Sequence, residues 1–160
     1  MKLLCEHDFR MALERHASMV YRLAYARTGN AADAEDICQD VFLSLSTKNP
    51  DFETVDDMKA WLIRVTINRA NTLWRTAWRR RVILDGPLDN SEEESQEDLM
   101  IREALSELSG KDRILIQLHY FEGYKLEEIA KIQRKSSTTV RSQLHRVHKK
   151  LRRIFKEERA

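Results

Sequence analysis

The most constraining feature of the sequence is an apolar stripe near its C-terminal end. Its members recur at steps of four and three residues: Val140, Leu144, Val147, Leu151 and Ile154. This spacing places them on one face of an α-helix, and an amphipathic helix buries such a face against other elements. The stripe therefore predicts a helix at about residues 137–157 that belongs to a packed domain.

The first part of the chain has the same helical character. Only 4 of the 160 residues are glycine and 2 are proline, which leaves little material for β-turns. A first helix is expected at about residues 8–27. Its inward face should comprise Phe9, Leu13, Ala17, Val20 and Ala24. The helix should stop at Gly29, and Asn30 should cap the next helix, with Asp33 at the matching position.

Two further helices complete the first half. The second should turn four apolar residues inward: Ile37, Val41, Phe42 and Leu45. The pattern breaks at Asn49-Pro50, and Thr54 with Asp57 predicts the capped start of a third helix. That helix should carry Met58, Trp61, Leu62, Val65 and Leu73, and end in the arginine block of residues 75–81.

Charge is strongly segregated, although the net charge is only +2. Residues 85–98 contain seven acids and no base, whereas residues 141–153 contain six bases and no acid. The acidic stretch includes Gly86-Pro87 and few apolar residues, which is typical of a flexible linker. We therefore expect an all-α protein with two small helical domains, residues 1–81 and 98–160, joined by a flexible acidic linker at residues 82–97.

The end of the chain predicts a helix-turn-helix. Helices are expected near residues 99–108, 112–121, 126–132 and 137–157, and the last two are separated by only a few residues. Ser136 or Ser137 can cap the final helix. In this motif the second helix enters the DNA major groove with its N-terminal residues at the base edges. Arg141 and Arg146 can then read guanine or bind phosphate, and Ser142 can do either.

The loop within this motif departs from the usual pattern. It reads Gln133-Arg134-Lys135, so Arg134 must accept a conformation that glycine adopts more easily. Lys135 must extend its stem along the core or face solvent. Lys125, where the first helix of the motif starts, is a poor N-cap. These residues predict a less rigid motif than usual.

Several other functions are not expected from the sequence. There is no run of about 18 apolar residues, so no membrane insertion is expected. Cys5 and Cys38 form neither a zinc-ligand spacing nor a disulfide framework, which favours a reducing cytoplasm. His145 and His148 have metal-ligand spacing but no further ligand nearby, so no metal is expected. No catalytic residues and no cofactor are predicted, because no acid–base dyad, phosphate loop or activated nucleophile is present.

Four segments of the chain are informative because of their order and spacing. They read DAEDICQDVFLSL from Asp33, WLIRVTINRANTLWR from Trp61, ALSELSGKDRILIQLHYFEGY from Ala104 and LEEIAKIQRKSSTTVRSQLHRVHKKL from Leu126. The first two resemble regions 2.2 and 2.3–2.4 of bacterial sigma factors, and the last two resemble region 4. In this order and spacing, from about Phe9 to Phe155, the chain resembles the extracytoplasmic-function (ECF) group of the sigma-70 family.

The resemblance implies a transcription initiation factor that binds core RNA polymerase, recognises −35 and −10 promoter elements and helps to melt the −10 region. It assigns the −35 element to residues of the last helix: Ser137, Thr138, Thr139, Arg141, Ser142, His145, Arg146 and Lys149. It assigns the −10 element to Arg64, Asn68, Arg69 and Arg75 of the third helix. It assigns core polymerase binding to an acidic and amide face of the second helix: Asp33, Asp36, Gln39, Asp40 and Leu43.

The resemblance also implies partners and a location. They are core polymerase, promoter DNA and an inhibitory anti-sigma factor, in the bacterial cytoplasm. The alternative is a self-sufficient helix-turn-helix regulator that binds palindromic duplex DNA without polymerase. The promoter sequence, the inducing signal and the identity of the anti-sigma factor have no signature in the residues. Cys38 is interpreted as a structural thiol.

Overall fold

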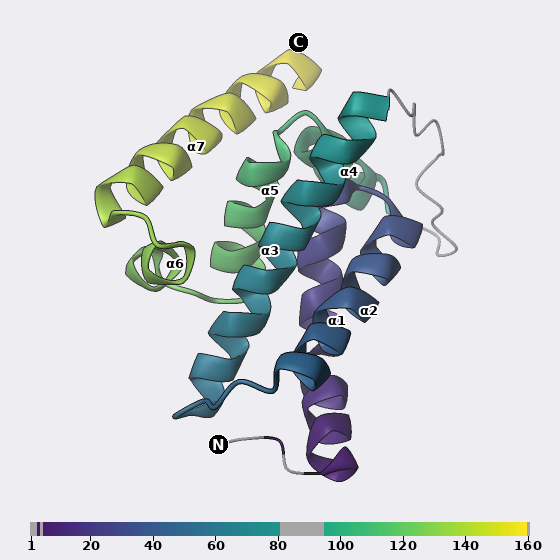
Figure 1. The fold of residues 1–160 in the computed structure, drawn as a ribbon. Coiled ribbons are helices and arrows are strands. Elements are labelled where there is room, and N and C mark those ends of the chain that lie inside the picture. Colours follow the sequence, from purple (N-terminus) through teal and green to yellow (C-terminus); the bar gives the residue numbers. More distant parts are fainter. Residues whose placement is uncertain (1–2, 4, 81–94, 160) are drawn as a thin grey trace. The chain divides into compact units, whose positions relative to one another are not determined.

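The computed structural model describes residue 3, residues 5–80 and residues 95–159. These residues form helices joined by short turns, with no strand among them, as Figure 1 shows. The chain divides into two compact units, Met1–Asp85 and Gly86–Ala160. The all-α fold class is therefore confirmed. The predicted flexible linker lies, for its residues 82–94, outside the described part of the chain.

The first unit is a bundle of three long helices: α1 (Glu6–Thr28), α2 (Ala31–Lys48) and α3 (Val55–Arg80). Each contacts the other two. Its most deeply buried side chains are Val20, Leu23, Val41, Leu45, Leu62 and Ile63. The predicted inward residues of α2 (Ile37, Val41, Phe42 and Leu45) are all buried. Hydrophobic burial of these faces holds the three helices together.

The predicted helix boundaries of this unit are confirmed at three places. Gly29 ends α1 with a φ of 68°, and its amide donates to the Tyr25 carbonyl at 2.8 Å. The Asn30 side chain accepts from the Asp33 amide at 3.0 Å and begins α2. At the start of α3, Thr54 Oγ1 accepts from the Asp57 amide at 3.1 Å, and the Thr54 amide donates to Asp57 Oδ2 at 3.2 Å. This reciprocal pair is a capping box.

One expectation for the first unit was wrong. Leu13 was expected to point inward but is 36% exposed. The buried face of α1 is instead centred about 60° away and includes Ala12 and His16, and a search for apolar residues passes over a buried histidine. The third helix was expected to end in the arginine block of residues 75–81, and α3 does end there, at Arg80. Arginine is a good helix former, and cations are favourable near a helix C-terminus.

The second unit contains α4 (Gln96–Ser106), α5 (Gly110–Ile116), the π-helical turn η1 (Gln117–Phe121), α6 (Leu126–Gln133) and α7 (Ser137–Arg159). The long helix α7 contacts α4, α5 and α6. The predicted apolar stripe of α7 is confirmed: Val140, Leu144, Val147 and Ile154 are buried, and Leu151 is half-buried. Its partners in the core include Ile114, Leu115, Leu118 and Ile129.

Side-chain caps shift two helix starts in this unit. Ser95 Oγ accepts from the Asp98 amide at 3.1 Å, so α4 begins at Gln96 and not near Leu99. Ser109 Oγ accepts from the Asp112 amide at 3.2 Å, so Gly110 is helical and not part of a turn. The single helix expected at 112–121 is divided into α5 and η1. Serine caps of this kind are strong local start signals.

Candidate functional site

The turn between α6 and α7 is a left-handed helix end built on Arg134. This residue has φ 56° and ψ 45°, the conformation that was predicted to be awkward for it. The Lys135 amide donates to the Ala130 carbonyl at 2.8 Å, which closes the Schellman pattern at the end of α6. Lys135 is exposed, so it takes the solvent-facing option. The turn hydrogen bonds therefore fix α7 relative to α6 despite the absence of glycine.

The starts of the two helices are held differently. Ser136, not Ser137, caps α7, because its Oγ accepts from the Thr139 amide at 3.1 Å. Lys125 contributes no side-chain cap to α6, as expected, but Glu128 Oε1 accepts from the Lys125 amide at 3.1 Å. One half of a capping box therefore compensates for the poor N-cap.

The solvent-facing side of α7 is polar and basic. Seven of the eight residues predicted for the −35 element are exposed, and Ser137 is half-buried. The exposed ones are Thr138, Thr139, Arg141, Ser142, His145, Arg146 and Lys149. Residues 137–156 contain no acid. Basic and hydroxyl side chains at the start of such a helix can contact base edges and phosphates together.

Two side chains of α7 have partners that sequence reasoning missed. Arg141 Nη2 lies 3.2 Å from Glu127 Oε1 on α6, with both side chains more than half exposed. His148 is half-buried, and its Nε2 shares a hydrogen bond with the Tyr120 hydroxyl of η1. No sequence spacing signals either contact, because each joins helices that the turn and the core bring together.

The exposed face of α2 has the opposite character. Asp36, Gln39 and Asp40 are exposed and Asp33 is half-buried, within an arc of about 120°. Leu43 lies within that arc and is 62% exposed. Burial, and secondarily the neighbouring Asp36 carboxylate, raises the pKa of Asp33. An exposed leucine among carboxylates is suited to a protein surface that offers an apolar contact and basic side chains.

The residues predicted for the −10 element fall into two groups. Arg64, Asn68 and Arg75 lie within an arc of about 40° on α3, with Asn68 and Arg75 exposed and Arg64 half-buried. Arg69 lies on another side of α3, where its Nη2 donates to Ser44 Oγ of α2 at 3.4 Å. The structure therefore brings three of these residues together and separates the fourth. The side chains of Trp74 and Trp78 lie outside the described residues.

Two contacts near this face were not found from the sequence. Phe52, in the loop before α3, is buried, and its ring meets the half-buried Trp61 ring edge-on at 5.9 Å between centroids. Arg27 is 5% exposed, and its Nε donates to Asn71 Oδ1 at 2.7 Å across α1 and α3. The sequence offered one indication of a structural role for Arg27, because it lies in the last turn of α1, where a cation is favourable. These contacts fix the loop and the middle of α3.

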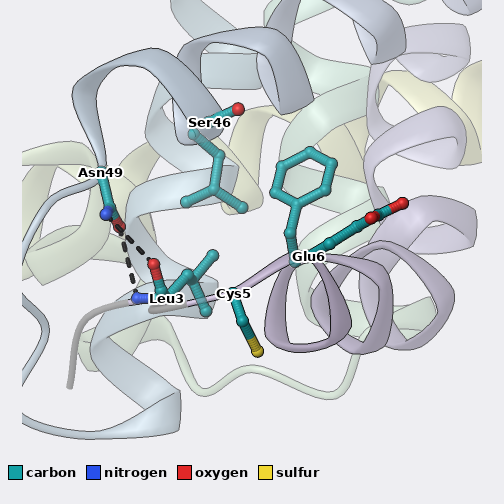
Figure 2. Close-up of a pocket in the computed structure, with 7 residues that line it drawn as sticks. Leu3, Cys5, Glu6, Ser46 and Asn49 are labelled. Carbon is teal, nitrogen blue, oxygen red and sulfur yellow. Dashed lines mark hydrogen bonds between the residues drawn. The ribbon is translucent and has the colours of Figure 1, made fainter.

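The end of α2 also holds the N-terminal segment. Asn49, with a φ of 41°, receives the Leu3 amide on its Oδ1 at 3.3 Å and donates from Nδ2 to the Leu3 carbonyl at 3.1 Å. Figure 2 shows this pairing beside a small pocket that Cys5, Glu6 and Ser46 also line.

The Cys38 Sγ lies 3.8 Å from the Ala17 carbonyl, and burial raises the pKa of its thiol. That environment supports the structural interpretation of Cys38.

Neither a metal centre nor a membrane-spanning helix occurs among the described residues. No group of three or more His, Cys, Asp or Glu side chains there could hold a metal ion. None of the helices there is both long enough and apolar enough to cross a membrane.

Taken together, the fold and its faces define a two-unit helical protein with a helix-turn-helix in its second unit. Residues 12–80 match the family Sigma-70 region 2, and residues 98–151 match the family Sigma-70, region 4. The chain belongs to the ECF group of sigma-70 RNA polymerase sigma factors, as the sequence resemblance predicted.

Individual relatives span most of the chain. The ECF RNA polymerase sigma factor SigL of Mycobacterium tuberculosis is 31% identical over 158 residues, covering 92% of this chain and 89% of that protein. The RNA polymerase sigma factor SigV of Bacillus subtilis is 30% identical, covering 86% of this chain and 84% of its own length.

Two solved structures share the fold. The sigma factor RpoE of Bartonella quintana, solved in complex with the anti-sigma factor NepR, has a TM-score of 0.74 and 26% identity, covering 93% of this chain and 97% of that chain. CnrH, solved in complex with the cytosolic domain of CnrY, has a TM-score of 0.72 and 21% identity, covering 96% of this chain and 91% of that chain.

Proposed function

We propose that this chain is a transcription initiation factor, and not an enzyme, that binds core RNA polymerase and directs it to specific promoters. The observation that carries the proposal is the presence of both sigma regions, each with an exposed face of the required chemistry. One face is acidic with a central leucine on α2, and another is basic on α7. A single-site regulator has no use for the first of these faces.

The second unit is proposed to bind the −35 element. The capped start of α7 presents Thr139, Arg141 and Ser142 at its exposed side, where a recognition helix meets base edges. Arg146 lies about one turn further along, and Lys149 lies beyond it, suited to phosphate contacts. Ser137 and Thr138 stand at the very start of the helix, and His145 lies one turn after Arg141.

The first unit is proposed to bind and help melt the −10 element. Extruding a base from the duplex costs a few kcal/mol, which contacts to the exposed base must offset. An exposed amide, Asn68, suits a base edge, while Arg64 and Arg75 on the same side of α3 suit the backbone. Arg69, held by Ser44, is proposed to support this surface from the side of α2.

The α2 face is proposed as the contact with core polymerase. Asp33, Asp36, Gln39 and Asp40 supply charge and hydrogen-bond acceptors, and Leu43 supplies an apolar anchor. A small apolar centre with a polar surround is the usual anatomy of a protein–protein interface.

An inhibitory partner is also proposed. The sigma factor of Bartonella quintana was solved with an anti-sigma factor, and this chain is similar to it over most of its length. We propose that a protein of the same kind restrains this chain, and that both act in the bacterial cytoplasm, where polymerase and promoters are found.

The proposed function is tested by mixing the protein with bacterial core polymerase. We expect co-elution of the two in size-exclusion chromatography, and run-off RNA only from templates with a cognate promoter selected from genomic fragments. Tight binding of the protein alone to a palindromic duplex, without association with core polymerase, would show a self-sufficient regulator instead.

A further inference from the structure

Two adjacent glutamates at the start of α6 make different contacts. Glu128 turns back on its own helix and accepts the Lys125 amide at 3.1 Å. Glu127 crosses to the next helix, where its Oε1 lies 3.2 Å from Arg141 Nη2. The two residues have the same charge, are both exposed and lie in the same helical turn. Only Glu127 touches a residue proposed to contact DNA.

The carboxylate of Glu127 has two favourable neighbours. The backbone N–H of Glu127 lies in the first turn of α6, where no helical carbonyl accepts from it. Hydrogen bonding to this backbone first, and to the Arg141 guanidinium second, lowers the pKa of Glu127 below its usual range. The carboxylate is thus an anionic acceptor against which the Arg141 side chain is oriented.

Arg141 is the residue that gains from such an acceptor. It lies near the N-terminal end of α7 and is exposed, so its long side chain has many accessible rotamers in the absence of a contact. Ion pairs this exposed contribute little to fold stability. Reading a guanine requires the planar guanidinium in one orientation, and a side chain ordered before binding loses less entropy when it binds.

We propose that Glu127 is a positioning residue that orients the Arg141 guanidinium for reading one base pair of the −35 element. The inference rests on the proposed function, because it presumes that α7 meets promoter DNA. It assigns Glu127 two opposing effects on binding. Its charge repels the phosphate backbone of any sequence, and its contact with Arg141 favours the correct base pair.

These effects are separated by Glu127→Gln, with Glu128→Gln as the matched control. Glutamine at 128 still offers an oxygen to the Lys125 amide, so each variant removes one charge from the same turn. Circular dichroism should show both folded. The assay is run-off transcription by the reconstituted holoenzyme on promoters altered at each −35 base pair in turn, with Arg141→Ala identifying the pair that Arg141 reads.

At the base pair that Arg141 reads, we expect Glu127→Gln to reduce discrimination between the correct and the altered promoter about fivefold. Transcription from altered promoters should rise about twofold, because the repulsion between Glu127 and the phosphate backbone is removed. Glu128→Gln should give a similar twofold rise with discrimination unchanged. In the Arg141→Ala background, Glu127→Gln should have no effect on discrimination.

Three outcomes would overturn the inference. They are unchanged discrimination in Glu127→Gln, an equal loss in Glu128→Gln, or the absence of any base pair whose discrimination depends on Arg141. A failure of the proposed function looks different, since the unmodified protein would then give no promoter-dependent RNA with core polymerase.

Discussion

The exposed faces of α2 and α7 differ in charge, and their helices are held in place by different local structures. The α2 helix is capped by Asn30 and Asn49 and lies in a three-helix bundle, and its exposed face mixes acids with the exposed Leu43. The α7 helix follows a turn at left-handed Arg134, and its exposed face is basic, with no acid from residue 137 to residue 156. We take the difference to indicate a protein partner for the α2 face and a polyanion for the α7 face. The net charge of +2 conceals this division.

The largest expected effect is on the α2 face. Asp36→Arg reverses a charge at the proposed polymerase contact, and like charges across an interface are costly. We expect core affinity to fall by about 2–3 kcal/mol, roughly 30- to 150-fold. Affinity would be measured by titrating labelled protein with core polymerase. Glu14→Arg makes the same charge change on exposed α1 and should leave affinity within about twofold. Equal losses in both variants would remove Asp36 from the interface.

A smaller effect is expected on the α7 face. If Arg146 pairs with one guanine, Arg146→Ala should lower transcription from an intact −35 element. The discrimination between the intact element and one altered at that base pair should fall by about 1–3 kcal/mol. Lys156→Ala removes an exposed cation further along the same helix and should spare discrimination at every pair. An equal loss of transcription from intact and altered −35 elements would indicate that Arg146 contacts phosphate. No loss of transcription at all would show that Arg146 lies outside the interface.

The turn that carries α7 should respond more weakly. Arg134 occupies the left-handed region, which costs a residue with a Cβ about 1–2 kcal/mol, while glycine loses about 0.5–1 kcal/mol through unfolded-state entropy. Arg134→Gly should therefore stabilise the second unit by about 0.5–1 kcal/mol in thermal unfolding. Gln133→Gly, one residue earlier in α6, should destabilise it by about 1 kcal/mol. Destabilisation by both would contradict the left-handed assignment.

The smallest effect is expected from pH, and it should be confined to the first unit. Burial, then Lys59 and Arg15, lowers the pKa of His16, whose Nε2 is buried without a partner. The folded pKa is below the unfolded one, so the unfolded chain binds more protons, and stability is lost as pH falls below about 6.5. All three tryptophans lie in the first unit, so their fluorescence follows its unfolding. His16→Gln should flatten the pH dependence, and an unchanged slope would exclude His16 as its source.

Local signals in the sequence predicted much of the fold. Asn30, Thr54 and Ser136 are caps whose partners lie within three residues, and the α7 stripe repeats within one helix. The errors came from tertiary packing. Leu13 is exposed because the buried face of α1 is rotated toward His16 and Arg27, about 40–60° from Leu13, and no local pattern anticipates buried polar residues.

The same distinction between local signals and tertiary packing applies to the residues of the candidate site. The exposure of Asp36, Asn68 and Arg146 follows from helical periodicity, which the sequence contains. The contacts Glu127–Arg141, Arg69–Ser44 and His148–Tyr120 join different elements, so they depend on how helices pack. Which residues share a face was therefore predictable, whereas which of them are held in place was not.

The division of labour between the two units is tested most directly by one measurement on the reconstituted holoenzyme. Permanganate reactivity of −10 thymines and occupancy of the promoter would be followed together for Asn68→Ala and Arg141→Ala. We predict that Asn68→Ala keeps −35-dependent occupancy but leaves the −10 thymines unreactive. We predict that Arg141→Ala lowers occupancy while the bound fraction melts normally. The same loss of occupancy and melting in both variants would contradict the account.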